Sequence, residues 1–186
     1  MRNLIYSINL TIDGCCDHMQ VGIPHDDLYD YSLRLVQDVD TFVYGRKTYQ
    51  LMVPYWPDIA KNPFGQEKMD IEFAQTFVLK KNIVFSKTLD KAEEENTEIV
   101  RANLKDEILK LKQKPGKSIL TGGVDIPSQL IQLGLVDEYR FVIFPVFGGK
   151  GKRLLETINL QEKSKLKLVE AKTFKSGTTA LHYRKQ

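Results

Sequence analysis

Three predicted strand ends carry residue types that are suited to binding phosphate groups. In "VYGRKTY", Gly45 ends a predicted strand, and Arg46, Lys47 and Thr48 fall in the first turn of the next helix. Positive side chains are mildly unfavourable there, because the helix N-terminus is itself positive. The turn therefore favours an anion, bound by backbone N–H groups, the Thr48 hydroxyl and two cations. A solvated helix start with chance basic residues is the alternative.

The other two strand ends show weaker forms of this pattern. "IVFSKT" ends a strand in Ser86 and Lys87. "ILTGGVD" connects a buried strand to a helix through four residues, Thr121, Gly122, Gly123 and Val124. Glycine lets the backbone approach a phosphate closely, but the spacing matches neither the three-glycine dinucleotide fingerprint nor a P-loop. A pyrophosphate-binding turn is predicted, with a tight packing turn as the alternative.

The elements that position these turns alternate along the chain. Residues 4–12 read as a strand closed by Asp13-Gly14, and "HDDLYDYSLRLVQDVD" predicts an amphipathic helix. Asn103 is a good N-cap for a helix that ends before Pro115-Gly116. "EYRFVIFPVFGG" reads as a central strand, and residues 175–177 as the turn of a terminal hairpin. We predict a mixed α/β fold with a mostly parallel sheet, whose ligands lie beyond the carboxyl ends of its strands.

Composition limits the class of protein. The 186 residues, 42% hydrophobic and 27% charged, predict a single globular domain over residues 1–186. A net charge of +3 does not imply nucleic-acid binding. Neither a signal peptide nor an apolar run of about 20 residues is evident, so we expect a cytoplasmic protein without membrane association. Cys15 and Cys16 are adjacent, which excludes a disulfide framework, and with His18 they give only a weak metal alternative, so no metal is expected.

The motifs together resemble a known family. "SINLTIDG", "FVYGRKTYQLM", "NIVFSKTL" and "ILTGGVDIPSQLIQLGLVDEYRFVIFPVFGGKG" are similar, in this order, to the motifs of dihydrofolate reductase-like proteins. The similarity is closest to the reductase domain of riboflavin biosynthesis, the RibD C-terminal domain, and its stand-alone bacterial relatives. It covers nearly the whole chain. The resemblance implies a three-layer αβα fold and an NADPH-dependent reductase of a small heterocycle, similar to 5-amino-6-(5-phosphoribosylamino)uracil reductase and dihydrofolate reductase.

The resemblance also implies roles for the turns. The residues that would recognise the 2′-phosphate side of NADPH, and so favour NADPH over NADH, are Gly45, Arg46, Lys47, Thr48, Ser86 and Lys87. The segment from Thr121 to Val124 would lie under the pyrophosphate. Asp13, at the end of the first strand, falls where the resemblance places nicotinamide and substrate, which makes it the candidate catalytic residue. An ordinary turn aspartate is the alternative.

Residues for substrate binding are harder to assign. The candidates are Asp27, Tyr31, Tyr49 and Trp56. Folate reduction needs a carboxylate from the first helix, yet at about 100° per residue Asp27 lies only at the flank of its apolar face, while Tyr31 points inward. Tyr49 and Trp56 are suited to stacking on a heterocycle, or else pin a surface loop at residues 54–64 to the core. That loop lacks the riboflavin family's phosphate-binding pattern, so the substrate stays open.

Two other functions compete with a reductase. A non-catalytic NADP(H)-binding protein is the main alternative. Nucleic-acid binding through Lys163, Lys165 and Lys167 is remote, because these lysines read as the solvent face of an edge strand. We expect a small-molecule substrate and no nucleic-acid or membrane partner. The resemblance alone implies a homodimer.

Overall fold

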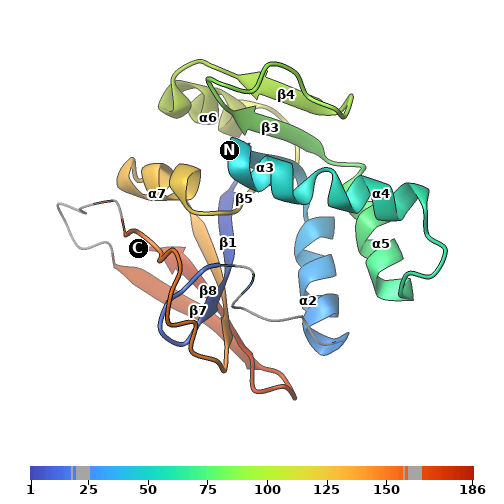
Figure 1. Ribbon diagram of the computed structural model, residues 1–186. Helices are drawn as coiled ribbons and strands as arrows, with labels where there is room; N and C mark the ends of the chain where they lie inside the picture. The colour runs from blue at the N-terminus through green and yellow to red at the C-terminus, as the bar shows by residue number, and fades with distance from the viewer. Residues whose placement is uncertain (18, 20–25, 157, 159–164) are drawn as a thin grey trace. The chain divides into compact units, whose positions relative to one another are not determined.

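The chain forms two compact units. The computed structural model describes residues 1–17, 19, 26–156, 158 and 165–186 (Figure 1). The first unit comprises Met1–Arg2 and Tyr29–Leu120, and the second comprises Asn3–Leu28 and Thr121–Gln186. Each unit is described by itself.

The first unit is built on parallel strands. Its strand order is β4-β3-β2-β5, and both β2 with β3 and β3 with β4 pair in parallel. The strands are β2 (Val39–Gly45), β3 (Lys81–Phe85), β4 (Thr97–Val100) and β5 (Ser118–Thr121). The helices are α2 (Asp26–Gln37), whose first turn belongs to the second unit, α3 (Arg46–Met52), α4 (Tyr55–Lys61), α5 (Lys68–Phe77) and α6 (Leu104–Gln113).

Aromatic packing holds the helices of the first unit to its strands. Phe42 of β2 stacks on Phe77 of α5, with ring centroids 4.9 Å apart. Trp56 of α4 packs on Phe73 of α5 at 4.5 Å. Phe42, Phe73 and Phe77 are buried. Large buried rings dominate the energetics of a core, so this cluster fixes α4 and α5 in place.

The second unit combines one parallel pair with an antiparallel hairpin. Its strand order is β1-β6-β8-β7. β1 pairs with β6 in parallel, whereas β6 with β8 and β7 with β8 are antiparallel. The strands are β1 (Leu4–Thr11), β6 (Glu138–Phe144), β7 (Leu166–Thr173) and β8 (Thr179–Lys185), and the helix is α7 (Asp125–Gln132).

The two faces of the β1-β6-β8 strands differ in character. One face carries rings, including Tyr6, Tyr139, Phe141 and Tyr183, with Tyr6 and Phe141 at 6.1 Å. The Tyr6 hydroxyl donates a hydrogen bond to the carbonyl of Gly123 at 2.9 Å, so this is the face that reaches the turn before α7. Because side chains alternate along a strand, the intervening residues form a separate, polar face.

The predicted fold class is confirmed. The parallel strands with helical connections and the antiparallel C-terminal hairpin are both present. Gly177, in the hairpin turn, has a φ of +82°, which glycine adopts without strain. Lys165 and Lys167 are exposed, as expected for an edge strand, whereas Lys163 lies outside the described residues. No described helix is both long and apolar enough to cross a membrane.

One local prediction was wrong. Residues 54–64 were expected to form a loop, but 55–61 form α4. Pro57 stands at the third helical position, where its missing N–H would have no intrahelical partner in any case. Asp58 adds a favourable negative charge in the same turn, and Pro57 and Ile59 are buried. Proline therefore starts this helix instead of preventing it.

Asn103 gives a test of the local architecture. Its side chain accepts hydrogen bonds from the backbone N–H groups of Lys105 and Asp106, as its predicted N-cap role requires. Replacing Asn103 with Ala should lower the free energy of unfolding by about 1 kcal/mol in urea denaturation. Asn103→Asp keeps the acceptor and should retain most of the stability. An equal loss in both variants would contradict the capping role.

Candidate functional site

The carboxyl ends of β2, β3 and β4 are aligned in the first unit. Gly45 pairs with Phe85, and Phe85 pairs with Val100. The residues that follow these strand ends are Arg46, Ser86 and Arg101, so they emerge side by side at one edge. Neighbouring strands lie about 4.8 Å apart, which brings these three residues within reach of a single phosphate group. Two of the three predicted turns are thus brought together.

The cations at this edge are available to a ligand. Arg46, Lys47 and Lys87 are exposed, and within the described part of the chain they form no ion pair. Gly45 is the N-cap of α3 and makes no side-chain capping bond, while Thr48 lies half-buried in the first turn. Because α3 has only seven residues, the charged side chains matter more here than the helix dipole.

Ser86 has a hydroxyl proton left to donate. Its Oγ accepts hydrogen bonds from the backbone N–H groups of Thr88, at 3.2 Å, and Leu89, at 3.0 Å. A hydroxyl carries one donor beside its acceptor lone pairs. The turn therefore holds the oxygen in place while its proton remains free for an anion.

Arg101 is a residue that the sequence reasoning missed. Its guanidinium donates to the carbonyl of Leu89 at 2.7 Å and so braces the turn that begins at Ser86. Its side chain is exposed, and its remaining N–H groups face no described acceptor. A signal existed, because Arg101 directly follows the strand "TEIV" just as Arg46 follows β2, but the predicted strand was taken to include Arg101.

The glycine turn lies in the second unit. Thr121 ends β5 and is buried, and Gly122, Gly123 and Val124 lead into α7. Gly123 has a φ of +82°, a conformation that favours glycine. The hydrogen bond from Tyr6 holds its carbonyl, and burial raises the pKa of the Tyr6 hydroxyl, so this group stays a donor. The turn is thereby fixed to β1.

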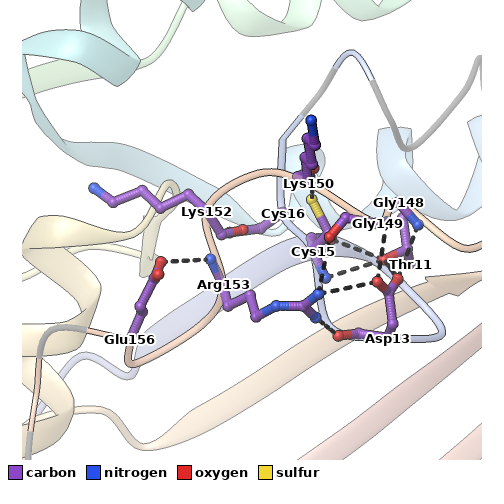
Figure 2. A network of polar contacts seen from close by, with 10 residues as sticks. All are labelled: Thr11, Asp13, Cys15, Cys16, Gly148, Gly149, Lys150, Lys152, Arg153 and Glu156. Atoms are coloured by element: carbon purple, nitrogen blue, oxygen red, sulfur yellow. Dashed lines mark hydrogen bonds and ion pairs between the residues drawn. The ribbon is translucent and has the colours of Figure 1, made fainter.

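Asp13 is the centre of a network in the second unit that Figure 2 shows. Its carboxylate accepts from the Thr11 hydroxyl at 2.5 Å and from the backbone N–H groups of Gly148, at 2.9 Å, and Gly149, at 3.1 Å. Arg153 forms an ion pair with it at 3.1 Å and also donates to its backbone carbonyl. Both carboxylate oxygens are therefore committed to the protein itself.

These contacts decide the ionisation of Asp13. The hydrogen bond from Thr11, the N–H of Gly148 and the Arg153 contact together hold the pKa of this carboxyl well below its ordinary range. An acid that is ionised throughout the neutral range cannot supply a proton. The geometry favours a role in joining the turn after β1 to residues 148–153. Its catalytic role stays a prediction.

Cys15 and Cys16 belong to the same network. The Cys15 thiol is buried and donates to the carbonyl of Lys150 at 3.4 Å, while Cys16 donates to that of Lys152 at 2.9 Å. Burial raises the pKa of the Cys16 thiol. No group of three or more metal-binding side chains occurs among the described residues, which do not include His18.

The predicted substrate residues differ in how far they are buried and in what they contact. Tyr49 is buried, and its hydroxyl accepts from the backbone N–H of Glu93 at 3.2 Å, which favours a structural role. Trp56 is half-buried in the aromatic cluster. Tyr31 is half-buried on α2 and engaged in a contact, and the side chain of Asp27 lies outside the described residues.

Similarity to known proteins agrees with this fold. The protein YyaP of Bacillus subtilis (strain 168), described as uncharacterized, is 32% identical over 189 residues, covering 98% of this chain and 94% of that protein. A putative riboflavin biosynthesis protein from Shewanella sp. PV-4 superposes with a TM-score of 0.74 and 17% identity, over 100% of this chain and 99% of that one.

A second solved structure shares the fold. It is a diaminohydroxyphosphoribosylaminopyrimidine deaminase/5-amino-6-(5-phosphoribosylamino)uracil reductase from Thermotoga maritima, with a TM-score of 0.69 and 16% identity. The match covers 100% of this chain but only 57% of that protein, so the chain corresponds to a part of it.

The class of protein follows from these observations. The strand orders and the C-terminal antiparallel hairpin are those of the dihydrofolate reductase-like fold. Within that class the family is shown as well. Residues 3–180 match the RibD C-terminal domain, and the chain belongs to that family.

The Asp13 network predicts a pH-dependent stability. Because folding lowers the pKa of Asp13, its ionised form stabilises the protein above the ordinary value of about 4 and loses this effect as the pH falls below it. Asp13→Asn should therefore be less stable than the natural protein at pH 7, and the difference should shrink towards pH 3. Urea unfolding at a series of pH values measures this. Asp30→Asn, an exposed residue of α2, is the control, and a difference that is constant with pH would contradict the prediction.

Proposed function

We propose that this chain is an NADPH-dependent reductase of a small heterocyclic compound. The observation that carries the proposal is the alignment of Arg46, Ser86 and Arg101 at one edge of the first unit. Membership of the RibD C-terminal family supports an oxidoreductase. The Thermotoga maritima protein, named as a uracil-derivative reductase, supports a heterocyclic substrate.

The charge at this edge favours NADPH over NADH. The two cofactors differ by a phosphate monoester at the 2′ position of the adenosine ribose, which carries nearly two negative charges at neutral pH. Arg46, Lys47, Lys87 and Arg101 offer cations to that group, and Ser86 offers a hydroxyl proton. Charge-assisted hydrogen bonds to a ribose hydroxyl would be fewer and weaker. These donors therefore suit the 2′-phosphate of NADPH better than the ribose hydroxyl of NADH.

The glycine turn of the second unit suits the rest of the cofactor. Gly122 and Gly123 let the backbone approach a pyrophosphate, and Gly123 already has the conformation that such a turn needs. α7 begins directly after this turn and can present N–H groups to an anion. We assign Thr121, Gly122, Gly123 and Val124 to the pyrophosphate.

The chemistry of the proposed reaction belongs mainly to the cofactor. Bound nicotinamide supplies the hydride, so the protein must bind, orient and exclude water. Asp13 serves in positioning: it ties the turn after β1 to residues 148–153. Tyr49 is left out of the proposed substrate residues because it is buried and engaged.

We also propose a domain organisation, a location and an oligomeric state. We propose a single functional domain, because the family match from 3 to 180 spans both units. A cytoplasmic location is proposed from the sequence, and a homodimer from the family resemblance. Whether the substrate is a folate or a riboflavin precursor is left to experiment.

Substitution of the edge arginines tests the cofactor assignment. A hydrogen bond to a charged group is worth about 1.5–3 kcal/mol, or about tenfold to a hundredfold in affinity. Arg46→Ala and Arg101→Ala should each raise the Kd for NADPH by about that factor and change the Kd for NADH by less than about threefold. Isothermal titration calorimetry with both cofactors measures this.

The matched control is Lys81→Ala. Lys81 lies at the opposite end of β3, where it pairs with Glu98 at 2.6 Å, so its loss removes one positive charge away from the proposed site. It should leave NADPH affinity unchanged. Equal losses in Arg46→Ala and Lys81→Ala would refute the site. Binding of NADPH without its oxidation by any pyrimidine, pterin or carbonyl substrate tested would favour the non-catalytic alternative.

A further inference from the structure

Arg140 occupies an unusual place on the polar face of the second unit. Strand pairing sets it in a row across this face, with Ser7 of β1 on one side, His182 of β8 on the other, and Glu170 of β7 beyond His182. The next row carries Asn9, Val142, Ala180 and Lys172. Two members of this second row, Val142 and Ala180, are buried apolar side chains, so the polar row that contains Arg140 borders the core.

Arg140 has fewer partners than its burial requires. Its side chain is only 20% exposed, and the one ion pair that it forms with a described residue, from Nη2 to Oε2 of Glu138, is long at 3.5 Å. Its Nε is fully buried and has no hydrogen-bond partner in the described part of the chain. A buried donor left unpaired is costly, because it has lost water without gaining another acceptor.

Glu138 cannot satisfy Arg140 because other groups already use it. One carboxylate oxygen accepts from the Asn3 amide at 3.0 Å and lies 3.4 Å from Arg184, and the other is 2.8 Å from Nε2 of His182. The nearby charges are therefore two arginines against one shared carboxylate, with Glu170 exposed at the far end of the row. The positive charge of Arg140 is left largely uncompensated.

The pKa of His182 responds to the positive charge of Arg140. Burial lowers its pKa, and the positive charge of Arg140 lowers it further, while the hydrogen bond to Glu138 acts in the opposite direction. The groups that face this ring are Glu138 and Arg140 from β6, Arg184 from its own strand and Glu170 from β7. An anion placed on Arg140 would therefore be felt at His182.

We propose that Arg140, with the Ser7 hydroxyl and the Asn9 amide beside it, binds an oxyanion of the substrate, a carboxylate or a phosphate. Neither Ser7 nor Asn9 has a polar partner among the described residues, and Asn9 is exposed. The planar guanidinium donates two parallel hydrogen bonds to such a group. That the oxyanion belongs to a reductase substrate rests on the proposed function; the binding of an oxyanion does not.

The test follows His182 by NMR. The pKa of His182 is measured from its ring proton in the whole protein, at constant ionic strength, with sodium chloride, sodium sulfate or sodium acetate. Sulfate stands for a tetrahedral anion whose charge is constant over the titration, and acetate stands for a carboxylate. Binding at Arg140 should raise the pKa of His182 relative to chloride, and the stronger of the two anions identifies the group.

Variants locate the effect. Arg140→Gln should raise the pKa of His182 without any anion and weaken the anion response by about tenfold or more. Arg140→Lys keeps the charge but not the paired donors, so it should fold and bind with intermediate strength. Arg184→Gln, which removes the other arginine beside Glu138, should leave anion affinity unchanged. No anion response in the natural protein, or equal losses in Arg140→Gln and Arg184→Gln, would overturn the proposal.

The cofactor experiment separates this proposal from the proposed function. NADPH should bind Arg140→Gln as it binds the natural protein. If the anion response is present but NADPH does not bind the natural protein, the oxyanion site stands and its assignment to a reductase substrate falls. If NADPH binds and no anion response occurs, the oxyanion site falls and the cofactor assignment stands.

Discussion

The parallel register of β2, β3 and β4 is the constraint on which the proposed cofactor site depends. Gly45 lies opposite Phe85, and Phe85 opposite Val100, so the next residue of each strand emerges at a common edge. A slip of one residue would turn every side chain to the other face. The burial of Val43 and Val84, both inaccessible to solvent, makes such a slip costly. Packing in the interior thus determines which cations meet at the surface.

In the second unit, two charged side chains differ in how many of their hydrogen-bonding groups already have a partner within the protein. Asp13 uses both carboxylate oxygens on Thr11, Gly148, Gly149 and Arg153, and so it has little capacity left for a ligand. Arg140 is largely buried, and a donor of its guanidinium is unpaired. Native proteins rarely leave such a donor without a partner unless something else supplies it. The presence of a charge would not by itself have shown which of the two residues still has a free hydrogen-bonding group.

The sequence predicted the alternation of strands and helices and the C-terminal hairpin, because each depends on local periodicity and turn chemistry. It could not supply contacts between residues far apart in the chain. Asp13 was interpreted as a pocket residue, and only the structure shows that Arg153, 140 positions away, contacts it. Arg140 became a candidate for ligand binding only when strand pairing placed it between Ser7 and His182, which lie on two other strands. α4 was missed for a local reason, because Pro57 was read as a breaker although it stands in a first turn.

The path of the chain through the two units sets an order of events during translation. Residues from Tyr29 to Leu120 are continuous and can begin to fold as they leave the ribosome, whereas the second unit joins Asn3–Leu28 to Thr121–Gln186. β1, with its apolar Leu4, Ile8 and Leu10, pairs with β6, which emerges later by on the order of ten seconds at usual elongation rates. For that interval the apolar side chains of β1 are without the strand that pairs with them in the folded unit.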